Sequence, residues 1–200
     1  MLLLACRRVV LSLAVGAAAA FFVLPASAAD PAQLIQSTAT EVIEIIKKTT
    51  PGPARQADIQ RVLQTNFDLP YMGQTALGVN WNKANEAERA RFLKAAESAE
   101  ARAYSERFGQ YGGQTLTVGK VTPRANGLFI IDSQLSQTSG QPIKLQWEVR
   151  DAGRGPRITD VKVEGVSMVM TRRSDFNSYI QSHGGSVEPL IAELESRAAR

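Results

Sequence analysis

The chain has 200 residues, of which 44% are hydrophobic and 21% charged, which is enough for one domain with a sizeable core. Its 23 lysines and arginines exceed its 19 acidic residues by a net charge of only +4, which is too small to predict binding to nucleic acid. With one cysteine and one histidine, the chain lacks the ligands of the usual zinc sites, so we expect no metal site.

The N-terminal segment 1–28 has the parts of a secretory signal peptide. Arg7 and Arg8 form its positive region, an apolar run follows, and residues 26–28 (Ala-Ser-Ala) form an A-x-A cleavage site. The apolar run is short for a transmembrane helix. We therefore expect a cleaved signal peptide and a single periplasmic domain over residues 29–200.

Cleavage of this signal changes the chemistry of the chain. It removes Cys6, the only cysteine, together with two arginines, so the net charge of +4 falls by two. The mature chain then has no thiol for a disulfide, a reactive site or a metal ligand.

Helical periodicity predicts a helix-rich first half. Apolar residues recur at helical spacing from Ile35 to Ile46, and a second helix is expected over residues 55–66. Asn85 and Glu88 have the spacing of a capping box, which predicts a long helix over residues 86–108.

Alternating apolar and polar residues predict four antiparallel strands after these helices. The clearest is residues 143–150, where every odd position is apolar and every even position is polar or charged. Asn126-Gly127 predicts a tight turn between strands near residues 116–121 and 128–135, although the facing of the second of these strands is ambiguous. The short turns favour an antiparallel meander with one solvated face.

The fourth strand, residues 158–170, is expected to bend. Its apolar residues occupy odd positions up to Val163 and even positions from just past Gly165 to Met170. We interpret this shift as a β-bulge at Gly165, after which a short helix carrying Phe176 folds onto the apolar face of the sheet. The order of helices, four strands and helices predicts an α+β domain. Its curved sheet and helices would form a half-cone, of the nuclear transport factor type, around an apolar cavity.

The sequence shows little catalytic chemistry, and we expect no enzyme, no catalytic residue and no cofactor. His183 stands at a helix end, where a histidine interacts favourably with the helix dipole. No phosphate loop or dinucleotide motif is present. Carboxylates such as Asp160 fall in strands or turns and are expected to be solvated.

Two groups of arginines have two interpretations each. Arg150, Arg154 and Arg157 cluster near one turn, either as solvated surface or as a contact for an anionic headgroup or a membrane protein. The pair Arg172-Arg173 either forms local salt bridges or lines a cavity mouth.

The apolar residues of the sheet and the long helix are interpreted either as a packed core or as the lining of a ligand cavity. Alanines on the long helix either allow a neighbouring helix to approach closely or leave room for a ligand, and flexible methionines suit irregular contents. The residues that we expect to line such a cavity are Phe92, Ala96, Tyr104, Trp147, Val163, Val166, Met168 and Phe176.

Three stretches resemble the MlaC / toluene-tolerance family. Residues 67–81 (FDLPYMGQTALGVNW) are similar to its F-x-x-x-x-M stretch followed by A-L-G and a tryptophan. Residues 160–176 (DVKVEGVSMVMTRRSDF) resemble its D-V-x-V-E-G-V-S strand, and residues 180–194 resemble its closing I-x-x-x-G-G-x-x-x-L-I motif. The likeness covers nearly the whole mature chain.

The resemblance implies a periplasmic carrier that holds a phospholipid by its acyl chains. Its implied partners are an outer-membrane lipoprotein complex and an inner-membrane ABC transporter. Residues 146–149 (QWEV) look at least as much like the hopanoid-associated HpnM branch, which implies a hopanoid as the alternative cargo. Two other hypotheses remain open: an enzyme on this scaffold that acts on a lipid, and an interaction module with a fully packed core.

Overall fold

The structure, a computed structural model, describes residues 30–108, 111–151, 153 and 155–200. The predicted signal peptide, its cleavage site, Cys6 and Arg154 lie outside the described residues. Among the helices of the described ranges, none combines the length and hydropathy needed to cross a bilayer.

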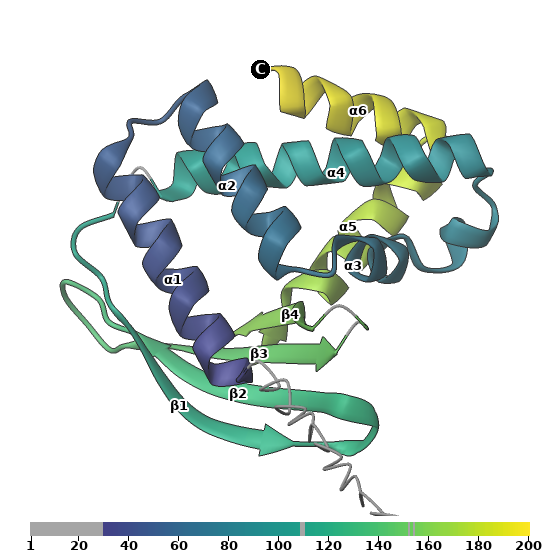
Figure 1. The fold of residues 1–200 in the computed structure, drawn as a ribbon. Coiled ribbons are helices and arrows are strands. Elements are labelled where there is room, and N and C mark those ends of the chain that lie inside the picture. Colours follow the sequence, from purple (N-terminus) through teal and green to yellow (C-terminus); the bar gives the residue numbers. More distant parts are fainter. Residues whose placement is uncertain (1–29, 109–110, 152, 154) are drawn as a thin grey trace, which may run out of the picture.

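Helices precede and follow one antiparallel sheet in the described residues (Figure 1). In chain order the elements are α1 (Pro31–Lys48), α2 (Pro53–Asn66), α3 (Leu69–Leu77), η1 (Gly78–Asn82), α4 (Glu86–Arg107), β1 (Leu116–Pro123), η3 (Ala125–Gly127), β2 (Leu128–Leu135), β3 (Ile143–Asp151), β4 (Pro156–Val163), β5 (Val166–Ser167), α5 (Met168–Ser182) and α6 (Glu188–Ala199). The predicted α+β class is confirmed, and a fifth short strand joins the four that were expected.

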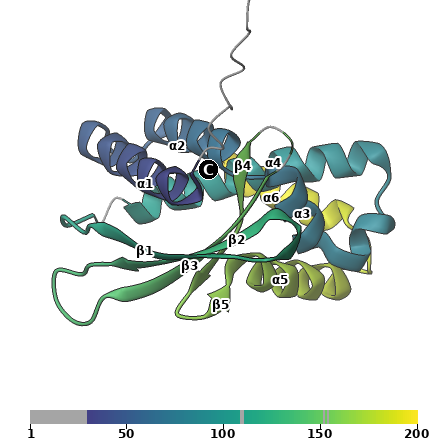
Figure 2. The ribbon, with the colours of Figure 1, turned by 60° about the horizontal axis from the view of Figure 1, so that its bottom comes forward.

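The strands pair in sequence order, β1-β2-β3-β4-β5, and the sheet is curved (Figure 2). The register places Ile131 opposite Trp147 and Trp147 opposite Val161, so these apolar residues share one face. The opposite face carries polar pairs such as Asp132 with Gln146. This resolves the facing of β2: its odd-numbered residues lie on the apolar face.

The expected bulge at Gly165 is wrong. β4 ends at Val163, and Glu164 and Gly165 both have positive φ, 49° and 84°, which is the geometry of a tight hairpin turn. β5 is only two residues long, and α5 begins at Met168 because the Ser167 side chain caps it. A turn shifts the positions of apolar residues as a bulge does, so the alternation alone did not separate them. The β4 bulge lies instead near Thr159, where the register with β3 shifts.

The helix that covers the apolar face of the sheet is α1, not the Phe176 helix. Ile35 of α1 is fully buried against Ile131, Val149 and Ile158, and α1 lies over the sheet in both views (Figures 1 and 2). The Phe176 helix, α5, packs chiefly on α3. The predicted capping box at the start of α4 is present, with Asn85 and Glu88 each accepting the other's backbone N–H.

The expected solvation of Asp160 is also wrong, since this residue is only 8% exposed. Its Oδ1 accepts the backbone N–H of Val161 at 2.8 Å and that of Val169 at 3.2 Å. Val169 stands in the first turn of α5, where N–H groups have no partner within the helix and the helix dipole favours a negative charge. Asp160 therefore ties the start of α5 to β4.

We predict that Asp160→Ala lowers the free energy of unfolding by about 1–3 kcal/mol, because it leaves buried N–H groups without their acceptor. Urea unfolding of the secreted chain measures this difference. The matched control is Asp151→Ala, because Asp151 is exposed and its carboxylate accepts the N–H of Gly153 in a turn. Equal losses for the two variants would contradict the role assigned to Asp160.

Candidate functional site

The apolar side chains of the described residues form three clusters that differ in how completely they are closed. The helical cluster joins α3, α4, α5 and α6, and 13 of its residues are buried against five that are half-buried. The sheet cluster lies between the sheet and α1, with four buried residues and eight half-buried ones. The hairpin cluster joins α1, α2 and α4, with three buried residues and six half-buried ones. The incompletely covered apolar surface therefore lies on the sheet side of the molecule.

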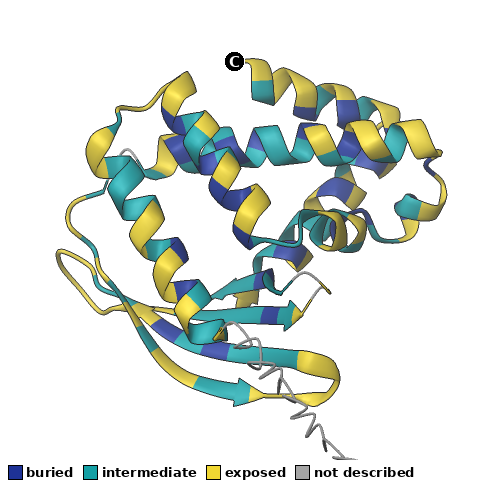
Figure 3. Cartoon of the chain, viewed as in Figure 1, coloured by how far each residue is buried: buried dark blue, intermediate teal, exposed yellow. Residues whose placement is uncertain are grey.

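Most of the sheet is half-buried in Figure 3, and α1 shows half-buried and exposed positions beside its buried ones. A well-packed interior leaves few apolar side chains in contact with water. Here the half-buried members of the sheet cluster are Leu34, Phe67, Leu116, Val118, Val121, Phe129, Trp147 and Val161.

Phe67 joins the sheet cluster to the hairpin cluster, since it packs against both. It forms a parallel β-bridge with Ile158, and the N–H of Asp68 donates to the Ile158 carbonyl at 2.9 Å. These bonds fix the junction of α2 and α3 on β4. We call the sheet and hairpin clusters together the apolar layer, and this layer is the candidate functional site.

The polar group of Trp147 is satisfied within this layer. Its indole N–H donates to the Ser133 hydroxyl at 2.8 Å, and Ser133 is buried on the neighbouring strand. The bond anchors the ring to the neighbouring strand and leaves its N–H donor paired. The apolar layer can therefore face a nonpolar ligand with its largest side chain in place.

Three of the eight predicted lining residues lie in or beside the apolar layer. Trp147 belongs to the sheet cluster and Tyr104 to the hairpin cluster. Val163 is half-buried and pairs with Leu145 on the apolar face of the sheet.

The other five lie elsewhere, so the structure does not bring the eight residues together. Phe92, Ala96 and Phe176 belong to the helical cluster, where the two phenylalanine rings meet edge to face with centroids 5.7 Å apart. Val166 is 56% exposed, and Met168 is half-buried at the start of α5. Val166 pairs with Val163 in the β4–β5 hairpin but stays largely exposed at the edge of the sheet, whereas Met168 lies beyond the hairpin in the first turn of α5.

The sequence analysis did not predict the side chains that α1 and the α2–α3 junction contribute to the apolar layer. Leu34, Val42 and Ile45 come from α1, and Phe67 and Leu69 come from the junction. The helical spacing of the first helix did predict an apolar face. Periodicity gives the face of a helix but not its neighbour, so it did not indicate that this face meets the sheet.

An ion pair connects α4 to α5 beside these clusters. Arg172 donates from Nε to Glu100 Oε1 at 2.5 Å and from Nη2 to Oε2 at 3.1 Å, with Asp175 at 3.4 Å from Nη1. Burial lowers the pKa of Arg172, but the hydrogen bond and charge of Glu100 more than offset it, so the pKa is raised overall. The expected local salt bridge of Arg172 is confirmed.

Tyr104 and Glu100 are one turn apart on α4, so they form the carboxylate–tyrosine combination that an acid–base enzyme would need. Burial raises the pKa of the Tyr104 hydroxyl, and the Glu100 charge raises it further. Glu100 is held by both oxygens in its ion pair with Arg172. A tyrosine with a raised pKa is a poor proton donor and a paired carboxylate is a poor base, so the geometry does not favour catalysis here.

His183 occupies the position expected for it at the end of α5. Its ring stacks on Tyr179 with centroids 4.0 Å apart, and its Nδ1 lies 2.8 Å from the Tyr179 carbonyl oxygen. This is a helix-terminal contact. Among the described residues, no group of three or more histidine, cysteine or acidic side chains is placed to hold a metal ion.

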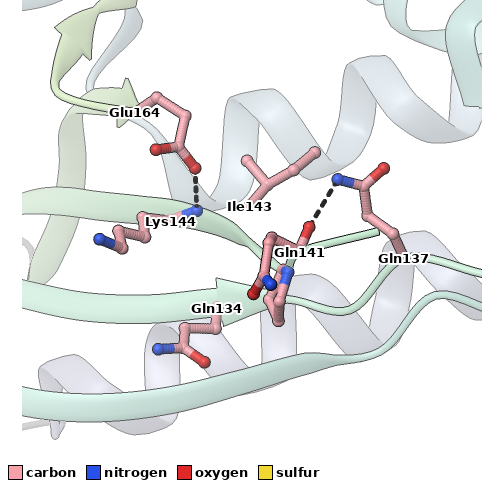
Figure 4. A pocket seen from close by; sticks show the side chains of 7 residues that line it. Gln134, Gln137, Gln141, Ile143, Lys144 and Glu164 are labelled. Atoms are coloured by element: carbon pink, nitrogen blue, oxygen red, sulfur yellow. Dashed lines mark hydrogen bonds between the residues drawn. The ribbon is translucent and has the colours of Figure 1, made fainter. Parts of the chain in front are cut away.

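One pocket of about 690 Å³ lies where β2 ends and β3 begins, beside the β4–β5 turn (Figure 4). Its walls are mostly polar, with Glu164 accepting the backbone N–H of Lys144 and the Gln137 amide donating to the Gln141 carbonyl. This pocket is a polar hollow outside the apolar layer.

A smaller pocket of about 190 Å³ adjoins the apolar layer at Phe67 and Leu69. The remaining lining residues are Gln64, Asp68, Pro70, Glu97 and Arg157. It therefore combines an apolar wall with charges of both signs.

Comparison with known proteins gives a family and a shared fold. The model of the family described as MlaC protein matches residues 36–196. Among solved structures, the chain is similar to a phospholipid-binding protein from Ralstonia solanacearum in complex with a phospholipid, with a TM-score of 0.71 and 19% identity. The match covers 86% of this chain and 98% of that one. At this identity the likeness shows a shared fold.

We predict that Phe92→Ala lowers the free energy of unfolding by about 3–5 kcal/mol, because Phe92 is fully buried in the closed helical cluster. Val161→Ala in the sheet cluster serves as the comparison and is expected to cost about 1 kcal/mol or less. Urea unfolding checks both values. If Phe92→Ala lowered the free energy of unfolding no more than Val161→Ala does, the helical cluster would not be more tightly packed than the sheet cluster.

Proposed function

Because the chain belongs to the MlaC family, we propose that it is a periplasmic protein that binds a phospholipid and carries it between membranes. The observation that carries this proposal is the contrast between the closed helical cluster and the half-covered apolar layer. The first gives the fold its own stability, and the second presents apolar surface to a ligand.

Acyl chains suit this surface physically. Each methylene group removed from water contributes about 0.8 kcal/mol, so one long chain contributes on the order of 10 kcal/mol. Binding of this kind requires no catalytic group and no cofactor. The phospholipid in the related Ralstonia solanacearum structure supports the same ligand class for this chain.

We assign the lining to the apolar layer rather than to the helical cluster. Tyr104, Trp147 and Val163 remain from the sequence-based set, and Phe67 and Leu34 join them. Phe92, Ala96 and Phe176 act as the packed support behind the site.

The carrier role extends the binding role to two partners. A secreted protein that shields acyl chains from water is suited to move lipid between an outer-membrane lipoprotein complex and an inner-membrane ABC transporter. Secretion by the signal peptide at residues 1–28 would place it between the two membranes. A hopanoid is the alternative cargo, because the flat Trp147 ring lies on the apolar face and residues 146–149 resemble the hopanoid-associated branch.

We predict that Val161→Trp reduces bound lipid, because the indole fills space beside Trp147 on the apolar face. Overfilling costs about 1–3 kcal/mol, which lowers affinity roughly five- to hundredfold. The measurement is lipid extracted per mole of purified protein, with phosphorus analysis for phospholipid and mass spectrometry for hopanoid.

The matched control is Val79→Trp, because Val79 lies in η1, is 63% exposed and belongs to none of the three apolar clusters. Circular dichroism verifies that both variants are folded. A folded Val161→Trp protein with as much lipid as the control would contradict the assignment of the site.

A further inference from the structure

The 190 Å³ pocket beside Phe67 holds opposite charges that do not contact each other. Arg157 of β4 lines it together with Asp68, from the α2–α3 junction, and Glu97 of α4. No salt bridge within 4.0 Å joins Arg157 to a carboxylate among the described residues. Unpaired charges of both signs around one space indicate a ligand that carries both signs.

The cationic side of the pocket has unused donor capacity. The one side-chain hydrogen bond of Arg157 within the described ranges runs from Nη1 to the Pro156 carbonyl at 3.3 Å. Its register partner on β3 is Arg150, whose guanidinium lies over the Tyr71 ring at 5.7 Å. Arg150 Nε is buried without a hydrogen-bond partner in this part of the chain. Arg150 does not line the pocket, so Arg157 is the cation that an anion in this space would meet, and the two would form charge-assisted hydrogen bonds.

The anionic side is positioned by contacts that leave one oxygen of each carboxylate available. Glu97 Oε1 accepts both the Gln60 amide at 2.5 Å and the Gln64 amide at 2.6 Å. Asp68 Oδ1 accepts the backbone N–H of Tyr71 at 3.1 Å as the cap of α3. Within the described residues, no hydrogen bond uses Glu97 Oε2 or Asp68 Oδ2. A cation with several N–H donors fits these two oxygens.

The apolar wall of the pocket leads into the apolar layer. Phe67 lines the pocket and packs in both the sheet and hairpin clusters, and Leu69 lines it and packs in the hairpin cluster. This space suits a small polar headgroup whose attached chains continue past Phe67.

We propose that this pocket binds a zwitterionic phospholipid headgroup, with its phosphodiester on Arg157 and its primary ammonium on Glu97 and Asp68. This inference rests on the proposed phospholipid-binding function and names the headgroup class. An anionic headgroup without an ammonium would meet two carboxylates with no compensating cation. A cargo without phosphate would leave Arg157 unpaired.

The test is competition between two lipids. The purified secreted chain is incubated with vesicles that contain equal amounts of phosphatidylethanolamine and phosphatidylglycerol, re-isolated and extracted, and the two lipids are quantified by mass spectrometry. We expect phosphatidylethanolamine to be enriched roughly five- to thirtyfold, the factor that corresponds to a difference of about 1–2 kcal/mol in binding free energy.

Two variants and one control test which residues bind the headgroup. Glu97→Gln should bring the ratio of the two lipids close to one, because it removes the charge but keeps the amide contacts. Arg157→Gln should lower the uptake of both lipids. Arg124→Gln, at the exposed turn between β1 and β2, removes the same charge elsewhere and should change neither value.

Equal uptake of the two lipids by the unaltered chain, or an unchanged ratio in Glu97→Gln, would overturn the headgroup assignment while leaving phospholipid binding intact. Uptake of neither lipid would instead overturn the proposed function, and the headgroup assignment with it.

Discussion

The inner face of the sheet carries more apolar surface than the helices above it cover, and the function that we propose depends on this difference. α1 buries the middle of the face through Ile35, but Phe129, Trp147 and Val161 around it stay half-buried. Exposed apolar surface costs about 25 cal/mol per Å². The half-covered layer is the feature on which our proposal of a hydrophobic ligand rests.

The fold tolerates this open layer because its stability comes from another part of the molecule. α3, α4, α5 and α6 pack a closed cluster in which Phe92, Ile180 and Ile191 are fully buried. Asp160 and the Glu100–Arg172 ion pair connect this cluster to the sheet and across to α4. The helical cluster is therefore packed independently of the half-covered face of the sheet.

The sequence alone predicted correctly those elements whose local residue pattern is compatible with only one secondary structure. Strict alternation fixed β3 and its apolar face, and the Asn85–Glu88 pair fixed the start of α4. Alternation failed at Gly165, because a tight turn and a bulge shift the pattern of apolar residues equally. The distinguishing signal was local: Ser167 is a helix cap, and its position predicts a helix rather than a continued strand.

The lining of the site was harder to predict than the fold. Trp147 and Val163 were predicted correctly as residues of the apolar face because they alternate on strands. Phe92 and Phe176 had the same apolar character but belong to the closed cluster. Which apolar face meets which depends on contacts between residues far apart in the chain, such as Phe67 with Ile158, and a single sequence does not encode these in any local period.

Native mass spectrometry of the intact secreted chain tests the central claim most directly. The account predicts a dominant species heavier than the bare polypeptide by the mass of a membrane lipid, with the excess lost on gentle activation. A spectrum that shows only the bare polypeptide, from protein purified without detergent and fully folded, would contradict it.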